Sequence, residues 1–452
     1  MVPAIGDNEN SKPVTSGHDA NNHKLNSAPP AEAVTRAGIR CARISIDFFV
    51  LATVSLAGGI AAALWVVGAV AGYFYQLSVL ALVHTFALGW ITAVIIGVMY
   101  RYVPALTHGT LPYPRLLMPQ FVLYVIGVSG MVSHFALGSW SGVWSAAIVV
   151  IASIVLFAAN IVPLLWPQVG RGVAESGMFI ALCFLIIAAA LGFMLAFDKS
   201  RGFLGGSVIS NLASHAHLAA LGWVTLTICA VSFRMVPALI LPGITLPKSA
   251  AWQLYGLAIG VVGLAVSLLI RAPGIALWSM AIAAALSAYV ITIARLVWTH
   301  RRPIDWSIRH AIAGIGWLIV AVVIGIVLAF TGAENEFGAR LAAAYGVLGI
   351  FGWMGNFIIG ISYYLFPGSV IRVRAVRGWR AMTHAALSVP TPCAFIFVAF
   401  NVGLAILVAG LLDANVTICV VATTIVATGV LAYSAATTWT LSFAYCSGKP
   451  VA

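Results

Sequence analysis

The chain has 452 residues, of which 62% are hydrophobic and only 8% are charged, and its mean hydropathy is +1.06. Soluble domains carry roughly 25% charged residues, so this composition excludes a soluble protein and indicates an integral membrane protein. The formal charge of +12 does not require a nucleic-acid partner. Basic residues gather in the cytoplasmic loops of membrane proteins, and this explains the charge.

The chain begins with a polar segment and continues as a series of apolar runs. Residues 1–43 have almost no apolar periodicity, and we expect them to form a disordered cytoplasmic tail. Each run that follows is long enough to cross a bilayer, which takes about 20 residues. The twelve predicted spans are 44–72, 76–103, 116–138, 142–166, 176–197, 211–237, 249–270, 273–299, 308–330, 339–366, 391–412 and 415–443. The predicted fold is therefore all-α and polytopic, with a second cytoplasmic tail at 444–452.

The positions of Lys and Arg predict the orientation of these spans. With the N-terminus inside and one crossing per run, 19 of the 23 Lys and Arg residues fall on the inner side. The four on the outer side are Lys199, Arg201, Arg271 and Arg340. Because cytoplasmic loops carry the excess of basic residues, we expect both termini in the cytoplasm and an even number of helices.

One pattern recurs in the second, sixth and tenth spans. Its centre is Trp90, Trp223 or Trp353, each preceded by Gly and followed by an aromatic residue ten positions later and a Pro fourteen positions later. We expect the Pro to close each span. The tryptophans are 133 and 130 positions apart, so the repeat returns every four helices. It predicts three pseudo-symmetric four-helix units, at 44–166, 176–299 and 308–443.

The residues just before the tryptophans include histidines. Packing explains the repeated Gly, Trp and Pro, but it explains these histidines less well. Small residues let helices approach closely, so packing alone accounts for the Gly, Trp and Pro. An imidazole inside a bilayer is costly and is a functional hypothesis by default. The residues eight and six positions before each Trp are, in chain order, Leu82 and His84, His215 and His217, and Tyr345 and Val347.

The sixth span resembles a known haem-binding helix. His215-Ala-His217-Leu-Ala-Ala-Leu-Gly-Trp-Val, with Phe233 and Pro237 after it, is similar to the tenth helix of subunit I of the haem–copper oxidases, and of the C-type oxidases in particular. That fold also has twelve helices in three units, so the resemblance in topology covers 44–443. In that family the first His of the pair binds the high-spin haem. The second binds the low-spin haem together with a His on helix 2, and copper is held by one His on helix 6 and two on helix 7.

This sequence departs from the oxidase pattern. The seventh span, 249–270, contains no His, and the tenth has Tyr345 and Val347 where the family has His-x-His. The His-x-His pair therefore lies one unit early, and we do not expect an oxygen-reducing centre in its usual place. Asp47 is the only acid near the membrane among the first helices, and without a carboxylate relay we do not expect a proton pump.

The resemblance implies how the residues pair between units. Residues two apart on a helix point in directions about 200° apart, so His215 and His217 serve different interfaces. By analogy with the family, the residue six before the Trp faces the following unit, and the residue eight before it faces the preceding one. The implied pairs are His84 with His215 at the first interface (units one and two), His217 with Tyr345 at the second (units two and three), and Val347 with Leu82 at the third (units three and one).

The first interface has the most potential ligands, and two chemistries fit it. His134 lies near the outer end of the third span, which corresponds by repeat to the copper-binding helix of the oxidases, and Met131 lies one turn before it. Either His84 and His215 are the axial ligands of a b-type haem, or His215 binds haem while His84 and His134 hold copper. His217 is a further haem-binding candidate, and Tyr345 is either a packing residue or a ligand or proton donor.

The resemblance therefore implies a b-type haem protein of the haem–copper oxidase superfamily in a bacterial inner membrane, with or without copper, that has lost or relocated its oxygen-reducing centre. Its role would be electron transfer or the handling of nitric oxide or another diatomic gas, with an electron-donor subunit or cytochrome as partner. The chain lacks a CxxCH motif, so a c-type haem would belong to a partner. The alternatives are a copper-handling or transport protein without haem and a helical scaffold whose histidines only form hydrogen bonds.

The remaining basic residues and histidines are expected at the lipid or water surface. The histidines in or beside basic cytoplasmic loops, for which we expect solvated positions, are His108, His300, His310 and His384. The arginines of the loop after the tenth span, which we expect to contact lipid phosphates, are Arg372, Arg374, Arg377 and Arg380.

Overall fold

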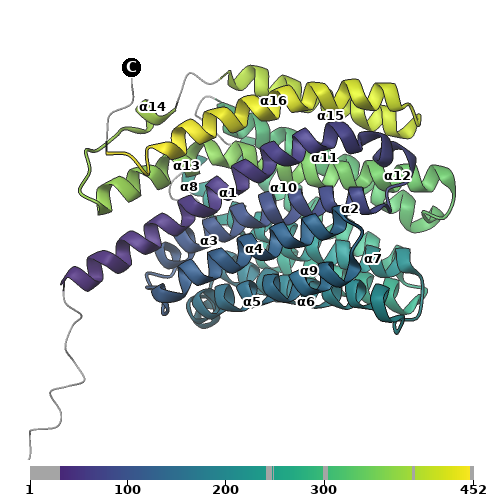
Figure 1. The fold of residues 1–452 in the computed structure, drawn as a ribbon, viewed down its shortest axis with the longest axis horizontal. Coiled ribbons are helices and arrows are strands. Elements are labelled where there is room, and N and C mark those ends of the chain that lie inside the picture. The colour runs from purple at the N-terminus through teal and green to yellow at the C-terminus, as the bar shows by residue number, and fades with distance from the viewer. Residues whose placement is uncertain (1–30, 241–246, 248, 299–303, 389–391, 448–452) are drawn as a thin grey trace, which may run out of the picture.

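The computed structural model describes residues 31–240, 247, 249–298, 304–388 and 392–447. Every regular element in these ranges is a helix, and no strand occurs among them. Twelve helical spans in the described ranges are long and apolar enough to cross a bilayer. The helices run side by side along the long axis of the molecule (Figure 1). The predicted all-α, twelve-span fold is confirmed.

The second, sixth and tenth spans each combine three helical elements, and the others are simpler. The first four spans are α1 (Ala31–Gly72); α2 (Leu77–His84), η1 (Thr85–Thr92) and α3 (Ala93–Leu106); η2 (Pro114–Leu116) and α4 (Leu117–Ala136); and α5 (Trp140–Leu165) with η3 (Trp166–Gln168). The next four are α6 (Val173–Arg201); α7 (Val208–His217), η4 (Leu218–Thr225) and α8 (Leu226–Ile240); α9 (Ser249–Ile270); and α10 (Ile275–Trp298). The last four are α11 (Trp306–Thr331); α12 (Glu336–Val347), η5 (Leu348–Gly355) and α13 (Asn356–Val376); α15 (Cys393–Leu412); and α16 (Val416–Ser442), with the short α14 (His384–Leu387) before α15.

The first helix begins earlier than predicted. α1 starts at Ala31, so residues 31–43, which we expected to be disordered, are helical. This part of the chain is rich in Ala and Arg, which favour helix, and Ala42 is already buried. Residues 1–30 of the predicted tail lie outside the described residues. α1 begins and α16 ends at the same end of the bundle, as an even number of crossings requires (Figure 1).

The second, sixth and tenth spans share an irregularity that the sequence did not predict. In each of them an eight-residue π-helix, η1, η4 or η5, starts directly after the position six before the Trp and contains that Trp. π-Helices are rare and occur mostly at functional sites. The repeat in the sequence is therefore also a repeat in backbone geometry.

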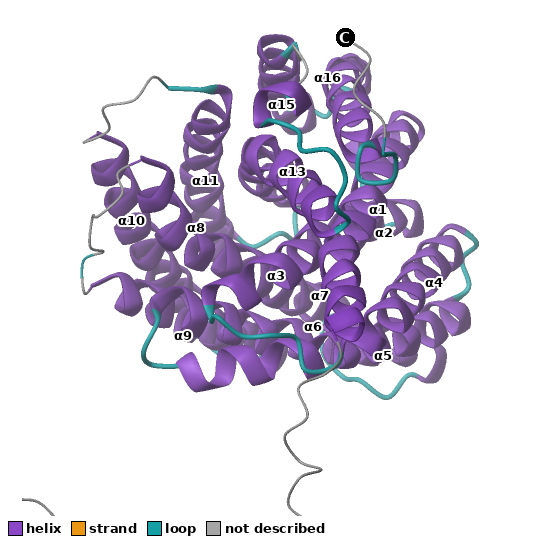
Figure 2. Cartoon of the chain, turned by 90° about the vertical axis from the view of Figure 1, so that its left-hand side faces the viewer, coloured by secondary structure: helices purple, strands orange, loops and turns teal. Residues whose placement is uncertain are grey.

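The three tryptophans link the inner helices in a ring. Trp223 Nε1 donates to Thr92 Oγ1 and Trp353 Nε1 donates to Thr225 Oγ1, both at 3.1 Å. Thr92 and Thr225 each lie two residues after a repeat tryptophan, and the residue in the same position after Trp353 is Gly355. Gly355 cannot accept through a side chain, and it packs directly against the indole of Trp90. Viewed end-on, α3, α8 and α13 lie toward the middle of the bundle with the other helices around them (Figure 2).

A second repeated contact lies within the units. Ser232 and Ser362 each stand nine positions after the repeat tryptophan. Ser232 Oγ lies 2.9 Å from the Tyr289 hydroxyl on α10, and the Tyr433 hydroxyl on α16 donates to Ser362 Oγ at 2.8 Å. These bonds fix the second helix of a unit against the fourth.

The repeated prolines do not close their spans as expected. Pro104, Pro237 and Pro367 all lie inside helices, and α13 continues beyond Pro367 to Val376. Proline is tolerated inside transmembrane helices, because neighbouring groups satisfy the backbone atoms that it leaves free. The part of α13 after Pro367 is held from the side, since Arg101 donates to Ser369 Oγ at 2.7 Å.

Candidate functional site

The first interface brings two imidazole rings together. His84 is the last residue of α2, and His215 lies in the last turn of α7. Their ring centroids are 6.5 Å apart, and the ring planes differ by only 16°. The two residues that the oxidase resemblance pairs are thus neighbours in the structure.

The hydrogen bonds of these two rings define their protonation. His84 Nδ1 lies 2.8 Å from the carbonyl oxygen of Leu80, and His215 Nδ1 lies 3.0 Å from that of Ala188. A carbonyl only accepts, so each Nδ1 carries a proton. In a neutral imidazole the other nitrogen then has a free lone pair. Both Nε2 atoms are therefore acceptors, and neither can donate to the other.

The surroundings of the pair are small or apolar. Gly192 of α6 leaves room for the His215 ring, since a β-carbon there would lie 2.7 Å from His215 Cε1. On the other side Phe135 of α4 covers His84, with ring centroids 4.8 Å apart, and Trp140 packs edge-on against Phe135. The two bases therefore face each other in an apolar interface, with Gly192 and Phe135 behind them.

His134, the expected third histidine, points elsewhere. Its ring packs against Gly142 of α5, and its buried Nδ1 has no hydrogen-bond partner in the described structure. The next residue, Phe135, takes the place beside His84. Among the described residues, no group of three or more His, Cys, Asp or Glu side chains is arranged to hold a metal ion. The structure therefore does not assemble the copper set His84, His134 and His215, because α4 turns the neighbouring Phe toward the pair.

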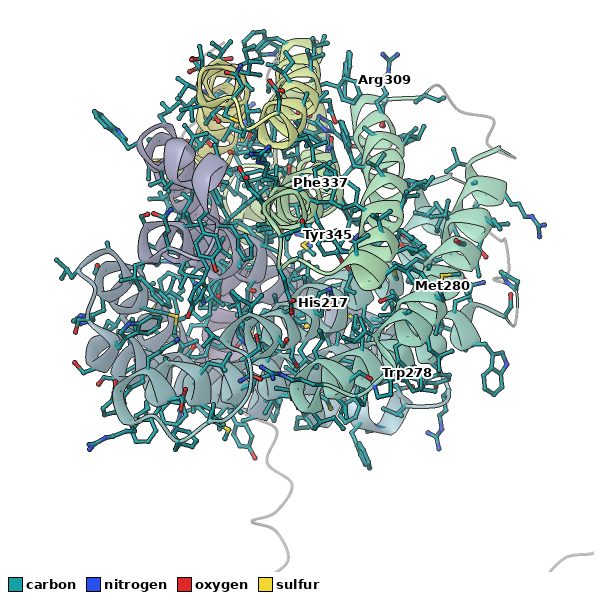
Figure 3. The ribbon with its side chains drawn as sticks, turned by 90° about the vertical axis from the view of Figure 1, so that its right-hand side faces the viewer. His217, Trp278, Met280, Arg309, Phe337 and Tyr345 are labelled. Carbon is teal, nitrogen blue, oxygen red and sulfur yellow. The ribbon has the colours of Figure 1, made fainter. Side chains whose placement is uncertain are left out.

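The second interface pairs a base with a donor. His217 and Tyr345 of α12 have ring centroids 5.9 Å apart and planes 27° apart. His217 Nδ1 lies 2.7 Å from the Ala213 carbonyl oxygen, so its Nε2 has the lone pair. The Tyr345 hydroxyl donates to this Nε2 in a long hydrogen bond of 3.5 Å. Figure 3 shows both side chains in the interior of the bundle.

The third interface is filled with apolar side chains. Val347 packs against a small cluster formed by Val67, Ala71, Leu411 and Cys419 of α1, α15 and α16. Leu82 packs against the main core. The three interfaces thus hold two bases, a base with a donor, and apolar side chains.

His310 was expected at the solvated surface, and this is wrong. Its side chain is fully buried, and its Nδ1 lies 2.8 Å from Asn356 Oδ1. The signal that could have found it is its position inside the predicted span 308–330. His108 and His384 are exposed as expected, and His300 lies outside the described residues.

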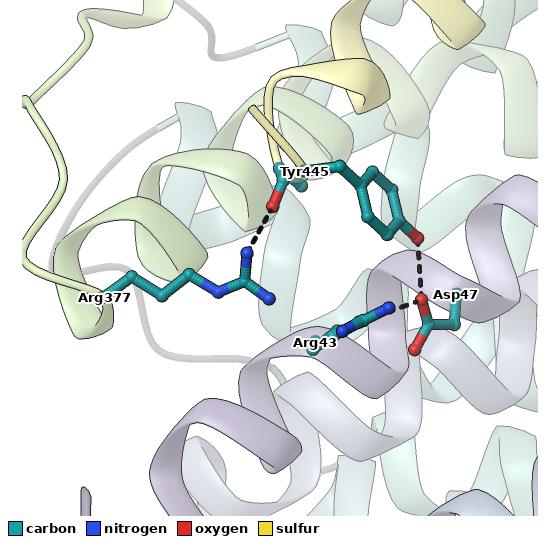
Figure 4. A network of polar contacts seen from close by, with 5 residues as sticks. Arg43, Asp47, Arg377 and Tyr445 are labelled. Carbon is teal, nitrogen blue, oxygen red and sulfur yellow. Dashed lines mark hydrogen bonds and ion pairs between the residues drawn. The ribbon is translucent and has the colours of Figure 1, made fainter. Parts of the chain in front are cut away.

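At the opposite end of the bundle, the end of the chain is tied to α1 and α13. The Tyr445 hydroxyl donates to Asp47 Oδ1 at 2.7 Å, and Arg43 Nε lies 3.6 Å from the same oxygen (Figure 4). Burial, followed by the bond to Asp47, raises the pKa of Tyr445. Arg377 donates to the Ala444 carbonyl at 3.2 Å.

One arginine of this region does not face lipid as expected. Arg374 is 1% exposed and donates to the backbone carbonyls of Arg380, Phe443, Cys446 and Ser447. Its guanidinium therefore replaces the water that would otherwise solvate the end of α16.

The twelve spans and the ring of inner helices define a polytopic helical membrane protein. Among solved structures, the chain is similar to a haem–copper terminal oxidase dimer determined by cryo-EM, with a TM-score of 0.62 and 13% sequence identity over 89% of this chain and 84% of that chain. At this identity the similarity shows the fold. No protein-family model matches the chain, and no curated protein does.

Proposed function

We propose that the chain is a membrane redox protein of the haem–copper oxidase superfamily that binds a b-type haem between His84 and His215. The observation that carries this proposal is two nearly parallel imidazoles whose Nε2 lone pairs have no donor among the described residues, with ring centroids 6.5 Å apart. Two imidazoles on opposite sides of one metal ion, with metal–nitrogen bonds of about 2 Å, have ring centres roughly 6.4 Å apart. The spacing of the two rings therefore fits a haem held between His84 and His215.

The donor set favours haem over a bare metal ion. Two histidines supply two ligands, and a metal held by them alone needs further ligands from elsewhere, which a porphyrin provides. Among the described residues no third His, Cys, Asp or Glu joins the pair. The oxidase-like fold supports the same choice. Copper bound by His84 and His134 has no such support, because His134 lies against Gly142.

The residues around the pair have defined roles in this proposal. His84 and His215 would hold the haem, and the carbonyl oxygens of Leu80 and Ala188 fix the tautomer and orientation of both rings. A bound haem would supply one-electron redox chemistry. The role that we propose is electron transfer, with an electron-donor subunit or cytochrome as partner. We place the protein in a bacterial inner membrane with both termini in the cytoplasm.

The reduced-minus-oxidised optical spectrum of the purified protein tests this, together with haem and copper determination. We expect a sharp b-type α band that is lost in His215→Ala and in His84→Ala. The matched control is His217→Ala, which removes the neighbouring histidine of the same helix and leaves the band in place.

Other outcomes contradict the proposal in different ways. A band that survives His84→Ala and is lost in His217→Ala would move the haem to the second interface. Stoichiometric copper without haem would support a copper-handling protein. Purified protein that contains neither haem nor copper would support a helical scaffold in which the histidines only form hydrogen bonds.

A further inference from the structure

The third unit contains a buried polar network that none of the three interfaces uses. His310 of α11 is 0% exposed, and its ring packs against Phe397 of α15 and Tyr363 of α13, with centroid distances of 5.1 and 6.0 Å. His310 Nδ1 lies 2.8 Å from Asn356 Oδ1. An ionisable side chain buried within a transmembrane span is a functional hypothesis by default.

The indole of Trp317 fixes the direction of every hydrogen bond in this network. Trp Nε1 can only donate, so the atom 2.8 Å from it on Asn401 is the amide oxygen. Asn401 Nδ2 then donates to Asn356 Oδ1 at 3.2 Å, and Asn356 Nδ2 donates to the Gly352 carbonyl at 2.9 Å. The partner of His310 Nδ1 is therefore an amide oxygen that only accepts. It follows that His310 carries a proton on Nδ1.

The opposite nitrogen of this ring is left without a partner. His310 Nε2 is buried without a hydrogen-bond partner among the described residues. The Tyr363 hydroxyl is buried too, and its proton points toward the Cys393 thiol, so its oxygen can still accept a hydrogen bond. The two rings are neighbours, and one water can donate to both atoms. A buried polar group without a partner costs about 1–3 kcal/mol. Ordered water commonly occupies such sites when complementary polar groups surround it.

We propose that His310 Nε2 and the Tyr363 hydroxyl hold one water molecule inside the membrane, and that this water makes His310 a proton acceptor. A proton that arrives through the water binds at Nε2, and the water remains. The product is an imidazolium whose Nδ1–H still donates to Asn356. This site lies in the third unit and does not depend on the haem proposal.

His310 lies near the N-terminal end of α11, which the arginine count predicts to be cytoplasmic. Asp305 caps α11 there, and the Tyr364 hydroxyl donates to its carboxylate. His310 lies five residues further, about 7.5 Å along the helix. The titratable or charged groups packed near the imidazole are Tyr363, with Tyr433 and Cys393 beside it, and Asp305 and Arg309 on α11 itself.

Hydroxyl-radical footprinting by X-ray radiolysis tests the water site, because it oxidises side chains beside ordered buried water. The sample is the purified full chain in lipid nanodiscs. We expect His310, which is 0% exposed, to be oxidised several-fold faster than Tyr289, which is 2% exposed and whose hydroxyl is bonded to Ser232. In Tyr363→Phe the oxidation of His310 should fall several-fold.

The matched control is Tyr433→Phe, which removes a hydroxyl bonded to Ser362, the residue next to Tyr363, and should leave His310 oxidation unchanged. Oxidation of His310 no faster than that of Tyr289, or unaffected by Tyr363→Phe, overturns the water site. If Tyr363→Phe does not fold, a cryo-EM map of the unmodified protein decides. Density for water between the two atoms supports the site, and direct contact of Nε2 with the Tyr363 oxygen contradicts it.

Nitrogen NMR of histidine-labelled protein tests whether His310 Nε2 accepts a proton. The His310 signal is assigned by its loss in His310→Gln. We expect Nε2 to gain a proton as the pH is lowered from neutral, while Nδ1 stays protonated throughout. If His310 Nε2 gains no proton before the protein unfolds, the proposal that His310 is a proton acceptor is wrong.

Discussion

The first and second interfaces have nearly the same backbone arrangement, but their side chains differ in hydrogen-bonding chemistry. In each, a residue directly before a π-helix faces a residue on the next inner helix, at 6.5 Å between ring centroids in one case and 5.9 Å in the other. At the first interface both partners are bases, His84 and His215. At the second, the Tyr345 hydroxyl donates a hydrogen bond to His217 Nε2. One exchange of residue type separates an interface with two bases from one in which the base has a hydrogen-bond donor.

The largest effect should follow removal of a ligand at the first interface. His215→Ala should abolish the b-type absorbance, whereas His217→Ala, two residues away, should leave it intact, because the helix points these side chains to different interfaces. Optical spectra and haem content of the purified variants check this. Equal losses in both variants would mean that the two interfaces do not differ as proposed.

A smaller effect should follow when the ligand stays and its support changes. In Gly192→Ala the new β-carbon would lie 2.7 Å from His215 Cε1, so the ring must move and haem content should fall although both histidines remain. The matched change at the second interface is Gly325→Ala, where the β-carbon would lie 3.2 Å from the Tyr345 ring. That variant should keep its full haem content. Haem-to-protein ratios measured side by side decide between these outcomes.

Tyr345→Phe tests the second interface alone. It removes the donor to His217 Nε2 and leaves a buried lone pair without a partner, which costs about 1–3 kcal/mol. Thermal unfolding in detergent should show this loss of stability, and the optical spectrum should not change. A changed haem spectrum would place the cofactor in contact with Tyr345 and so contradict the comparison.

The smallest effect is expected at the far end of the bundle, where Tyr445→Phe leaves both interfaces untouched. Burial raises the pKa of Tyr445 in the folded protein above its unfolded value of about 10. Such a group stabilises the fold fully below about pH 10, and this contribution is lost as the pH rises through the folded value. The unmodified protein should therefore lose stability above about pH 10, and Tyr445→Phe should flatten that loss. The same alkaline profile in both proteins would rule out this residue as the cause.

The sequence predicts much of this architecture because its signals are local or periodic. Twelve apolar runs predict the spans, and the repeat around three tryptophans, together with the resemblance to the oxidases, predicts both pairs of rings. The π-helices could not be predicted, because their sequences read as ordinary apolar helix. The direction of the His134 side chain depends on how α4 packs. The side chain beside His84 is that of the next residue, Phe135, and His134 lies against Gly142. His310 was missed because nearby basic residues outweighed its position in an apolar run.

The ring of tryptophans also bears on how the protein assembles during synthesis. Trp223 donates backward to Thr92, and Trp353 donates backward to Thr225, so each new unit finds its polar acceptor on the unit made before it. The ring closes at Gly355 through packing, and the closing seam is held by the bond from Tyr445 to Asp47, 398 positions apart. Units fold in order from the N-terminus. The contacts that join the last spans to the first can thus form only after the twelfth span has been translated.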